Sequence, residues 1–373
     1  MRYLSRISAI PLPIRLAAIS FLFSLSVQSS SIFQSLYAHD LGASRFQVGL
    51  IGSSYGIAYF VSSFIFGRQS DRHGRLIFVR LGLALGAAAY VLQIAAIDPM
   101  TLLAIRAFVG FCLGISSAAI MAYVYEAEGQ VGRFAAYGSL GWLFGCLSAA
   151  AARNYDALFI ISGSASALAF CLSFTFTEDK RRGLRVPLFP LSLIRDNGRV
   201  YIPFFLRCLG SSAVWAVFPL FLVSIGASKL WVALLDAINM GLQFIAMRYV
   251  ERFNSTKVLA VGLIASVVVF ASYGFATHYL QLIPAQILLA VSWSCLWVGS
   301  LSFLLGKSVE RGTAAGLLYS MTYLSAGIGP LMGGLLSDRW DFRVLMFAAS
   351  GVTFLGLILS RVLPANKQVS SSQ

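Results

Sequence analysis

Three charged side chains lie well inside long apolar runs of this sequence, away from the ends of the runs. Arg106 and Arg207 each lie about two helical turns from an end of their run, and Asp236 is the only carboxylate expected in the middle part of such a run. A guanidinium group binds carboxylate and phosphate groups well, and carboxyl groups buried in membranes often relay protons. The two arginines therefore favour an anionic solute, and Asp236 is a candidate proton carrier.

Each of these residues also has a structural alternative. Arg106 and Arg207 can extend their head groups to a membrane surface, although holding an arginine at the centre of a span costs about 2.5–3.5 kcal/mol on insertion scales. Asp236 is an ordinary solvated acid if it faces the outer interface instead of the interior. The choice between a functional and a structural role for these three residues thus depends on whether their charged groups are buried.

Uncharged polar and aromatic side chains recur at helical spacing in the same runs. They form a candidate solute cavity with Arg207: Gln28, Trp215, Asn239, Gln243, Trp293 and Trp297. Amides and hydroxyls in such runs can also serve as contacts between helices worth about 0.6–2 kcal/mol each. Tryptophans can also mark a membrane interface, an interpretation that fits Trp215 less well because it lies near the middle of its run.

The elements that would position these residues are membrane-spanning helices. The chain has 373 residues, 58% hydrophobic and 11% charged, with a mean hydropathy of +0.80, whereas soluble domains average about 25% charged residues. A spanning helix needs roughly 20 apolar residues, and twelve such runs are present. We expect spans at 14–37, 46–66, 76–97, 100–125, 132–152, 156–176, 200–225, 230–249, 258–277, 280–305, 314–336 and 343–363.

The first run is too long for the apolar part of a typical signal peptide, and we interpret it as a retained helix. Basic residues set the orientation, because cytoplasmic loops are enriched in them. Of the 28 lysines and arginines, those in loops on the side away from the termini are Arg45, Arg153, Lys229, Arg339 and Arg343. This bias predicts a multi-pass protein of the cell membrane with both termini cytoplasmic, and it accounts for the net charge of +14 without nucleic acid.

The spans divide six and six around a basic interval. We expect a first half at 1–177, a cytoplasmic linker at 178–199, a second half at 200–364 and a tail at 365–373. The apolar part of the linker, 186–194, either lies on the membrane surface or forms a proline-broken loop. LGAS at 41–44 and IGAS at 225–228 both close odd-numbered spans and precede a basic residue, which indicates a parallel duplication.

One charged loop between the second and third spans carries a recognisable pattern, Gly67-x-x-x-Asp71-Arg72-x-Gly74-Arg75. This loop resembles the signature loop of the major facilitator superfamily. Arg106-x-x-x-Gly110-x-x-x-Gly114 in span 4 is similar to a second motif of that superfamily, and Gly327-x-Gly329-Pro330-x-x-Gly333-Gly334 echoes it in span 11. The resemblance covers essentially the whole chain. It implies an all-α membrane protein with twelve transmembrane helices in two six-helix halves.

The residue types in this loop have physical reasons. Gly67 permits close helix approach, Gly74 suits a turn with positive φ, and Asp71 can accept hydrogen bonds from helix amides or an arginine. Arg72 and Arg75 hold the loop on the cytoplasmic side. Their expected partners lie at the end of span 4, namely Glu126 and Glu128. The resemblance implies that the loop is a latch between the halves in alternating access.

The resemblance also implies a secondary active transporter whose spans 1, 4, 7 and 10 line a central cavity. Arginines in the span 4 motif are tied to proton coupling across the family, which pairs Arg106 with Asp236 as coupling candidates. Span 1 lacks an acidic residue and span 5 lacks a Gly-Pro pair, and both departures weaken a drug/proton antiporter. Drug efflux, uniport and a non-transporting membrane sensor remain as alternatives.

The residues that define several other classes of protein are not found in this sequence. Gly306-Lys307-Ser308 ends like a phosphate-binding loop, but position 301 is leucine where that pattern requires glycine. The three histidines are scattered, and the five cysteines fall in apolar runs as packing residues. We therefore expect no enzyme activity, no cofactor and no metal. The expected partners are a small-molecule solute, membrane lipid and a proton as coupling ion, and the chain is expected to act as a monomer.

Overall fold

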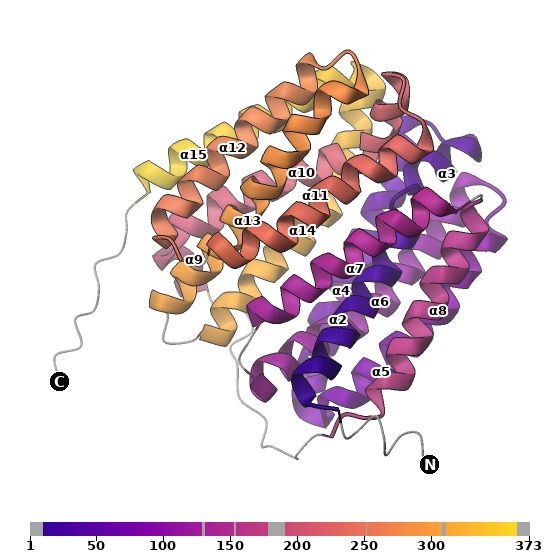
Figure 1. Ribbon diagram of the computed structural model, residues 1–373, viewed down its shortest axis with the longest axis vertical. Helices are drawn as coiled ribbons and strands as arrows, with labels where there is room; N and C mark the ends of the chain where they lie inside the picture. The colour runs from indigo at the N-terminus through magenta and orange to yellow at the C-terminus, as the bar shows by residue number, and fades with distance from the viewer. Residues whose placement is uncertain are drawn as a thin grey trace.

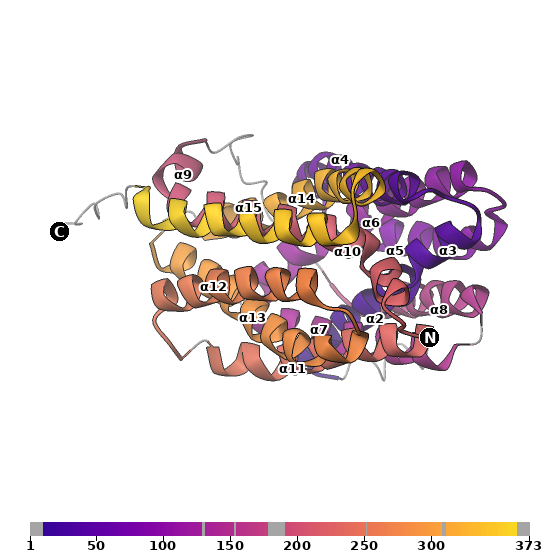
Figure 2. The ribbon, with the colours of Figure 1, turned by 90° about the horizontal axis from the view of Figure 1, so that it is seen from above.

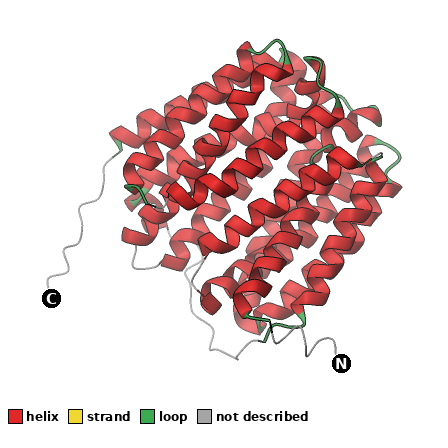
Figure 3. Cartoon of the chain, in the orientation of Figure 1, coloured by secondary structure: helices red, strands yellow, loops and turns green. Residues whose placement is uncertain are grey.

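The chain folds into a bundle of long helices. The computed structural model describes residues 10–128, 131–152, 154–177, 191–250, 252–307 and 311–363, and every regular element within these ranges is a helix (Figure 3). Eleven of the described helices are long and apolar enough to cross a membrane. The remaining predicted span is α14 (Arg311–Arg339), which is 29 residues long but less apolar.

Each predicted span corresponds to a helix or a pair of helices. The first six are α2 (Leu12–Ser31) with α3 (Gln34–Asp40), α4 (Arg45–His73), α5 (Arg75–Leu92), α6 (Pro99–Glu128), α7 (Val131–Ala151) and α8 (Tyr155–Ser173). The last six are α10 (Gly198–Ser224), α11 (Lys229–Val250), α12 (Ser255–Phe275), α13 (Leu282–Lys307), α14 and α15 (Phe342–Val362). Three short pieces accompany them: η1 (Gln93–Ala95), α9 (Leu191–Asp196) and η2 (Tyr279–Gln281).

The first span is interrupted, where the sequence predicted one continuous helix. The helix stops after Ser31 and resumes at Gln34, and Phe33 leaves helical geometry with φ −107° and ψ 15°. The serines just before the break face neighbouring helices: Ser29 Oγ lies 2.9 Å from Ser148 Oγ, and Ser30 Oγ lies 3.3 Å from Gln93 Oε1. The interruption therefore falls where α2 makes polar contacts with α7 and η1.

The internal repeat has the same backbone geometry in both copies. Gly42 and Gly226 each adopt a φ of +89°, a left-handed conformation that glycine adopts without strain. The next residue closes the helix end in each case, since Ala43 N donates to Ala38 O at 3.0 Å and Ala227 N donates to Leu222 O at 2.9 Å. The two anchors are thus matching helix C-caps, as a duplicated unit predicts.

The helices form two groups that contact each other along two lines. Helices α2 to α8 pack mainly on one another and lie to the right in Figure 1, and α10 to α15 do the same to the left. The contact lines are α4 against α14 and α7 against α11. Figure 2 shows these pairs at opposite edges of the molecule. This arrangement leaves α2, α6, α10 and α13 with most of their neighbours inside their own group.

Glycines make the α4–α14 line close. A Cβ atom built on Gly49 would lie 2.8 Å from the Cα of Gly334, and one on Gly52 would lie 2.9 Å from the Pro330 side chain. Ser53 Oγ accepts a hydrogen bond from the backbone N–H of Leu331 at 2.9 Å. Small residues at such a crossing allow the two backbones to touch, so this line is a tight joint between the two groups.

Candidate functional site

The charged loop joins α4 to α5 at the same end of the bundle as the chain termini. Gly74 is the hinge, with a φ of +97°, which confirms the positive φ expected there. A Cβ on Gly67 would lie 3.2 Å from the Ala118 side chain, so α4 and α6 pack closely just before the loop. Arg72 is exposed and Arg75 is half-buried.

The expected latch pairs fall outside the described side chains. The backbone of Asp71 belongs to α4, and those of Glu126 and Glu128 belong to α6, but the positions of these three side chains are not described. The pairing of Arg72 or Arg75 with the glutamates therefore stays a prediction. The described part of the loop supplies its turn geometry and its placement.

Arg106 is buried within the first half, with 1% of its surface exposed. Its guanidinium group donates to Ser30 Oγ at 3.0 Å, to Gln93 Oε1 at 3.2 Å and to Ser31 Oγ at 3.4 Å. It also lies 4.5 Å from the centre of the Tyr55 ring, a cation–π contact. All these partners are neutral, and the Nε atom has no hydrogen-bond partner in the described part of the chain.

Arg207 is equally buried within the second half. Its Nε donates to Ser266 Oγ at 3.0 Å and its Nη1 lies 3.4 Å from Ser211 Oγ. The guanidinium carbon lies 4.9 Å from the Trp293 ring and 5.7 Å from the Phe270 ring. Its Nη2 has no hydrogen-bond partner among the described residues. Both arginines are thus buried, and their partners among the described residues are all neutral.

Asp236 lies on α11 where that helix packs against α7. It is 7% exposed, and its buried Oδ1 finds no hydrogen-bond donor in the described structure. Cys146 on α7 and Tyr273 on α12 lie near enough for the charge of Asp236 to act on them. Gln28 of α2 lies close by, because its Nε2 is 3.3 Å from Cys146 Sγ. Asp236 is therefore an interior acid between the halves.

The structure brings some of the predicted residues together and separates others. Asn239 and Gln243 bond each other at 3.0 Å on the same helix as Asp236. Arg106 and Asp236 do not share a hydrogen bond or an ion pair among the described contacts. The partners of Arg106 lie on α2, α4 and η1, whereas those of Asp236 lie on α7 and α12. The two coupling candidates thus occupy different neighbourhoods.

The tryptophans divide in the same way. Trp293 and Trp297 stack on α13, with ring centres 5.6 Å apart and planes 24° apart. Trp215 is half-buried and packs edge-on against Phe218 at 4.9 Å, beside a hydrophobic core that contains residues of both halves. The Arg207 neighbourhood therefore includes Trp293 and Trp297, while Trp215 lies with packing residues.

The sequence interpretation missed four tyrosines near these groups. Tyr59 on α4 stacks on Tyr323 of α14, with ring centres 4.3 Å apart and hydroxyls 3.0 Å apart. Tyr55 precedes Tyr59 by one turn, and Tyr319 precedes Tyr323 by one turn and contacts Trp297 at 4.7 Å. The sequence contains a partial signal for these tyrosines, because a pair of tyrosines spaced four residues apart occurs in each of the two glycine-rich spans.

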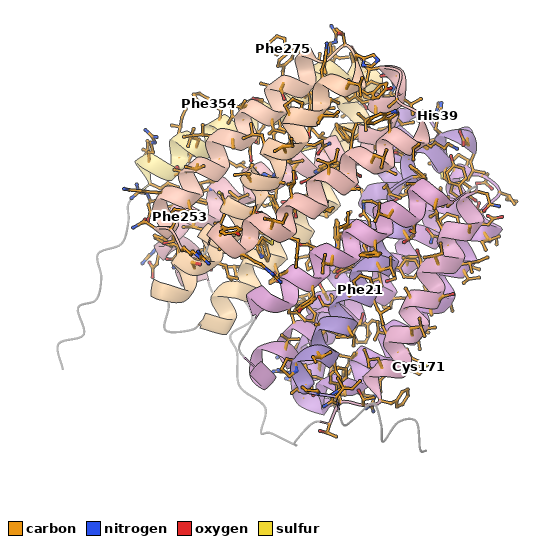
Figure 4. The ribbon with its side chains drawn as sticks, in the orientation of Figure 1. Phe21, His39, Cys171, Phe253, Phe275 and Phe354 are labelled. Carbon is orange, nitrogen blue, oxygen red and sulfur yellow. The ribbon has the colours of Figure 1, made fainter. Side chains whose placement is uncertain are left out.

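It also missed a polar cluster at the end opposite the termini. Lys229 Nζ lies 3.5 Å from Asp40 Oδ2 and donates to the Tyr155 hydroxyl at 2.6 Å. Tyr155 in turn donates to Asp40 Oδ2 at 2.5 Å. Arg45 nearby donates to Ser337 O at 2.8 Å. These contacts join α3, α4 and α8 of the first half to α11 and α14 of the second. Figure 4 labels His39 at this end and Cys171 at the other.

The described residues offer no metal site, since no three side chains of His, Cys, Asp or Glu come together among them. Among the described residues the interior holds two buried cations, one buried acid and a set of aromatic rings. Such groups can bind charged and aromatic molecules.

Comparisons with known proteins agree on the class of fold. The model of the Major Facilitator Superfamily matches residues 16–235 and 200–373. The multidrug resistance protein MdtG of Salmonella heidelberg (strain SL476) is 24% identical over 362 residues, which cover 88% of this chain and 89% of that protein. The chain is also similar to two solved structures. The nucleoside transporter NupG has a TM-score of 0.73 and 16% identity, with 95% of this chain and 99% of that one covered. The human organic anion transporter MFSD10 has a TM-score of 0.74 and 18% identity, with coverages of 94% and 100%.

Proposed function

This chain belongs to the major facilitator superfamily of membrane transporters, and we propose that it moves a small anionic solute across the cell membrane by proton-coupled alternating access. Both termini would lie on the cytoplasmic side. The observation that carries the proposal is the charge balance of the described part of the interior. Arg106 and Arg207 are both 1% exposed with neutral partners among the described residues, and Asp236 is the one buried acid in that part of the chain.

The excess positive charge favours an anion as cargo. A buried cation without a counter-ion is costly in an apolar interior, so a bound carboxylate or phosphate would be stabilised by it. The Nη2 group of Arg207 has no hydrogen-bond partner among the described residues, so its N–H groups can donate to such an anion. An arginine fork also distinguishes planar oxyanions from other solutes.

Asp236 is the proposed proton carrier. It lies between α7 and α11, one of the two lines along which the halves meet, and its Oδ1 is unpartnered among the described groups. A carboxyl group that is exposed to one side and then to the other as the halves rock would load and release a proton. The charged loop from Gly67 to Arg75 would serve as the latch at the cytoplasmic end.

Reconstituted vesicles test both parts. We expect labelled organic anions to enter faster when an inward proton gradient is imposed. Asp236→Asn should lose this acceleration while keeping exchange of solute between compartments of equal pH, because only proton movement is removed. Gradient-driven accumulation by Asp236→Asn would contradict the coupling role.

Two other functions would give different results. Uptake of an anion that ignores the pH gradient would indicate uniport. The name of the relative MdtG favours a second candidate, multidrug efflux by antiport. That function predicts transport of neutral or cationic hydrophobic drugs, and it predicts that Arg207→Gln leaves their transport intact. A chain that binds solutes but moves none would be a sensor.

A further inference from the structure

Six aromatic rings form a ladder that crosses from one half of the molecule to the other. Tyr55 and Tyr59 stand 5.9 Å apart on α4, and Tyr59 stacks on Tyr323 of α14. Tyr319 lies one turn from Tyr323 on the same helix. Tyr319 in turn contacts Trp297 of α13, and Trp297 stacks on Trp293 of the same helix.

A buried arginine lies at each end of this ladder. Arg106 covers the Tyr55 ring at 4.5 Å, and Arg207 covers the Trp293 ring at 4.9 Å. Aromatic faces carry partial negative charge and attract cations, which accounts for the placement of the guanidinium groups. At the Arg207 end the guanidinium group is not fully hydrogen-bonded, because its Nη2 has no hydrogen-bond partner in the described part of the chain.

The tryptophans are not part of a belt at the membrane surface. Aromatic belts lie near the ends of spans, but Trp293 is the twelfth residue of a 26-residue helix. Its ring is half-buried, as is that of Tyr319, while Trp297 between them is 7% exposed. Phe204 of α10 also lies 6.3 Å from Trp293. This end of the ladder thus offers two partly exposed aromatic rings beside an arginine N–H group that has no hydrogen-bond partner among the described residues.

We propose that Arg207, Trp293 and Tyr319 form a subsite for a planar aromatic carboxylate. The ring of the solute would stack against Trp293 and meet the Tyr319 ring edge to face, because Trp297 is nearly parallel to Trp293 but at 76° to Tyr319. Its carboxylate would accept a hydrogen bond from Arg207 Nη2. This inference rests on the proposed function, because it names the kind of anion that is carried. A saturated carboxylate would satisfy Arg207 but would gain no stacking.

Binding by calorimetry to the purified full chain separates these contributions. The probes are 1-naphthoate, cyclohexanecarboxylate with the same charge but a saturated ring, and 1-naphthalenemethanol with the same rings but no charge. We expect 1-naphthoate to bind about tenfold more tightly than cyclohexanecarboxylate, the sum of the contacts with two rings. Arg207→Gln should weaken both carboxylates and leave the alcohol unchanged.

The variants make the aromatic contribution explicit. Trp293→Leu should weaken 1-naphthoate about fivefold, the value of one aromatic pair, without affecting cyclohexanecarboxylate. Trp293→Phe should restore part of this loss and shows that the fold tolerates change there. The matched control is Phe144→Leu, which removes an aromatic pair with Phe21 on the exposed side of α7 (Figure 4 labels Phe21). It should leave all three affinities unchanged.

The outcomes distinguish this inference from the proposed function. Equal affinity for the two carboxylates, or equal losses in Trp293→Leu and Phe144→Leu, would overturn the aromatic subsite while leaving anion transport standing. Tightest binding of the alcohol would overturn the carboxylate part and would favour a drug site. Absence of binding for all three probes would also overturn the subsite, and anion uptake into vesicles would then still report on the transport proposal separately.

Discussion

Arg106 and Arg207 tolerate burial through the same two kinds of contact. Each donates to serine hydroxyls and lies over an aromatic ring. A desolvated cation–π contact contributes about 2 kcal/mol, whereas an arginine at the centre of a span costs about 2.5–3.5 kcal/mol on insertion scales. Neutral hydrogen bonds offset part of the rest, but the charge itself stays uncompensated. A position that serves packing alone would be filled equally well by an apolar side chain.

Replacement of Arg106 by methionine therefore separates structure from function. Ser30 and Gln93 bond each other at 3.0 Å in any case, so they keep a partner when the arginine is removed. A buried charge without an ionic partner is costly in an apolar interior, and an apolar side chain of similar size avoids that cost. We expect Arg106→Met to keep or raise the melting temperature in detergent and to reduce anion uptake into vesicles.

Arg106→Lys is the control, because it keeps the charge without the planar fork. A melting temperature that falls in step with uptake in Arg106→Met would show that the arginine is a structural contact.

At the scale of elements, the α4–α14 joint depends on one proline and the glycine opposite it. Pro330 lies inside α14 and has no N–H, so the carbonyl of Ala326 loses its helical partner. A Cβ on Gly56 of α4 would overlap that same carbonyl. The glycine thus makes room for a carbonyl that the proline has freed, and the two helices meet backbone to backbone.

Gly56→Ala should therefore destabilise the protein. Adding a methyl group to a filled contact costs about 1–3 kcal/mol, and here the obstacle is backbone, which cannot rotate away. The matched control is Gly351→Ala on α15, where a Cβ would meet nothing within 4 Å and where alanine raises helix propensity by about 1 kcal/mol. Thermal unfolding in detergent should show a lower midpoint for the first variant and an equal or higher one for the second. Equal midpoints would contradict a tight joint.

The sequence predicted elements better than it predicted contacts, for physical reasons. Hydropathy locates spans because lipid demands about 20 apolar residues, and the turn at Gly74 was predictable because glycine adopts a positive φ without strain. The positive φ values of Gly42 and Gly226 were not predicted, although the repeat that contains them was. The break after Ser31 was not predictable, because its polar contacts come from other helices. The aromatic ladder was missed for the same reason, because nothing in an apolar run indicates which residue of a distant helix an aromatic side chain will contact.

At the scale of the whole molecule, the two halves are joined by charged groups at the end opposite the termini. Asp40 and Tyr155 of the first half hold Lys229 of the second. Arg45 bridges to α14 and also lies 4.1 Å from the Phe342 ring. If that end faces outward, as the distribution of basic residues predicts, these contacts close the outer side and must separate when the transporter opens there.

Removal of Lys229 should therefore favour the state that is open at that end. Asp40 and Lys229 have side chains 53% and 55% exposed, and exposed ion pairs contribute about 0.2–1 kcal/mol, so Lys229→Met should raise the open population by no more than about fivefold. Val232 is fully buried one turn below Lys229, and a cysteine at this position reports on opening. Its labelling by an impermeant maleimide on intact cells should speed up by the same factor.

The charge swap Asp40→Lys with Lys229→Asp should restore slow labelling of the cysteine. Arg343→Met, which removes an exposed charge at the same end, should not change the labelling rate. Labelling that is unchanged in Lys229→Met would show that the helix joints alone hold this end closed. No labelling from outside in any variant would show that this end faces the cytoplasm.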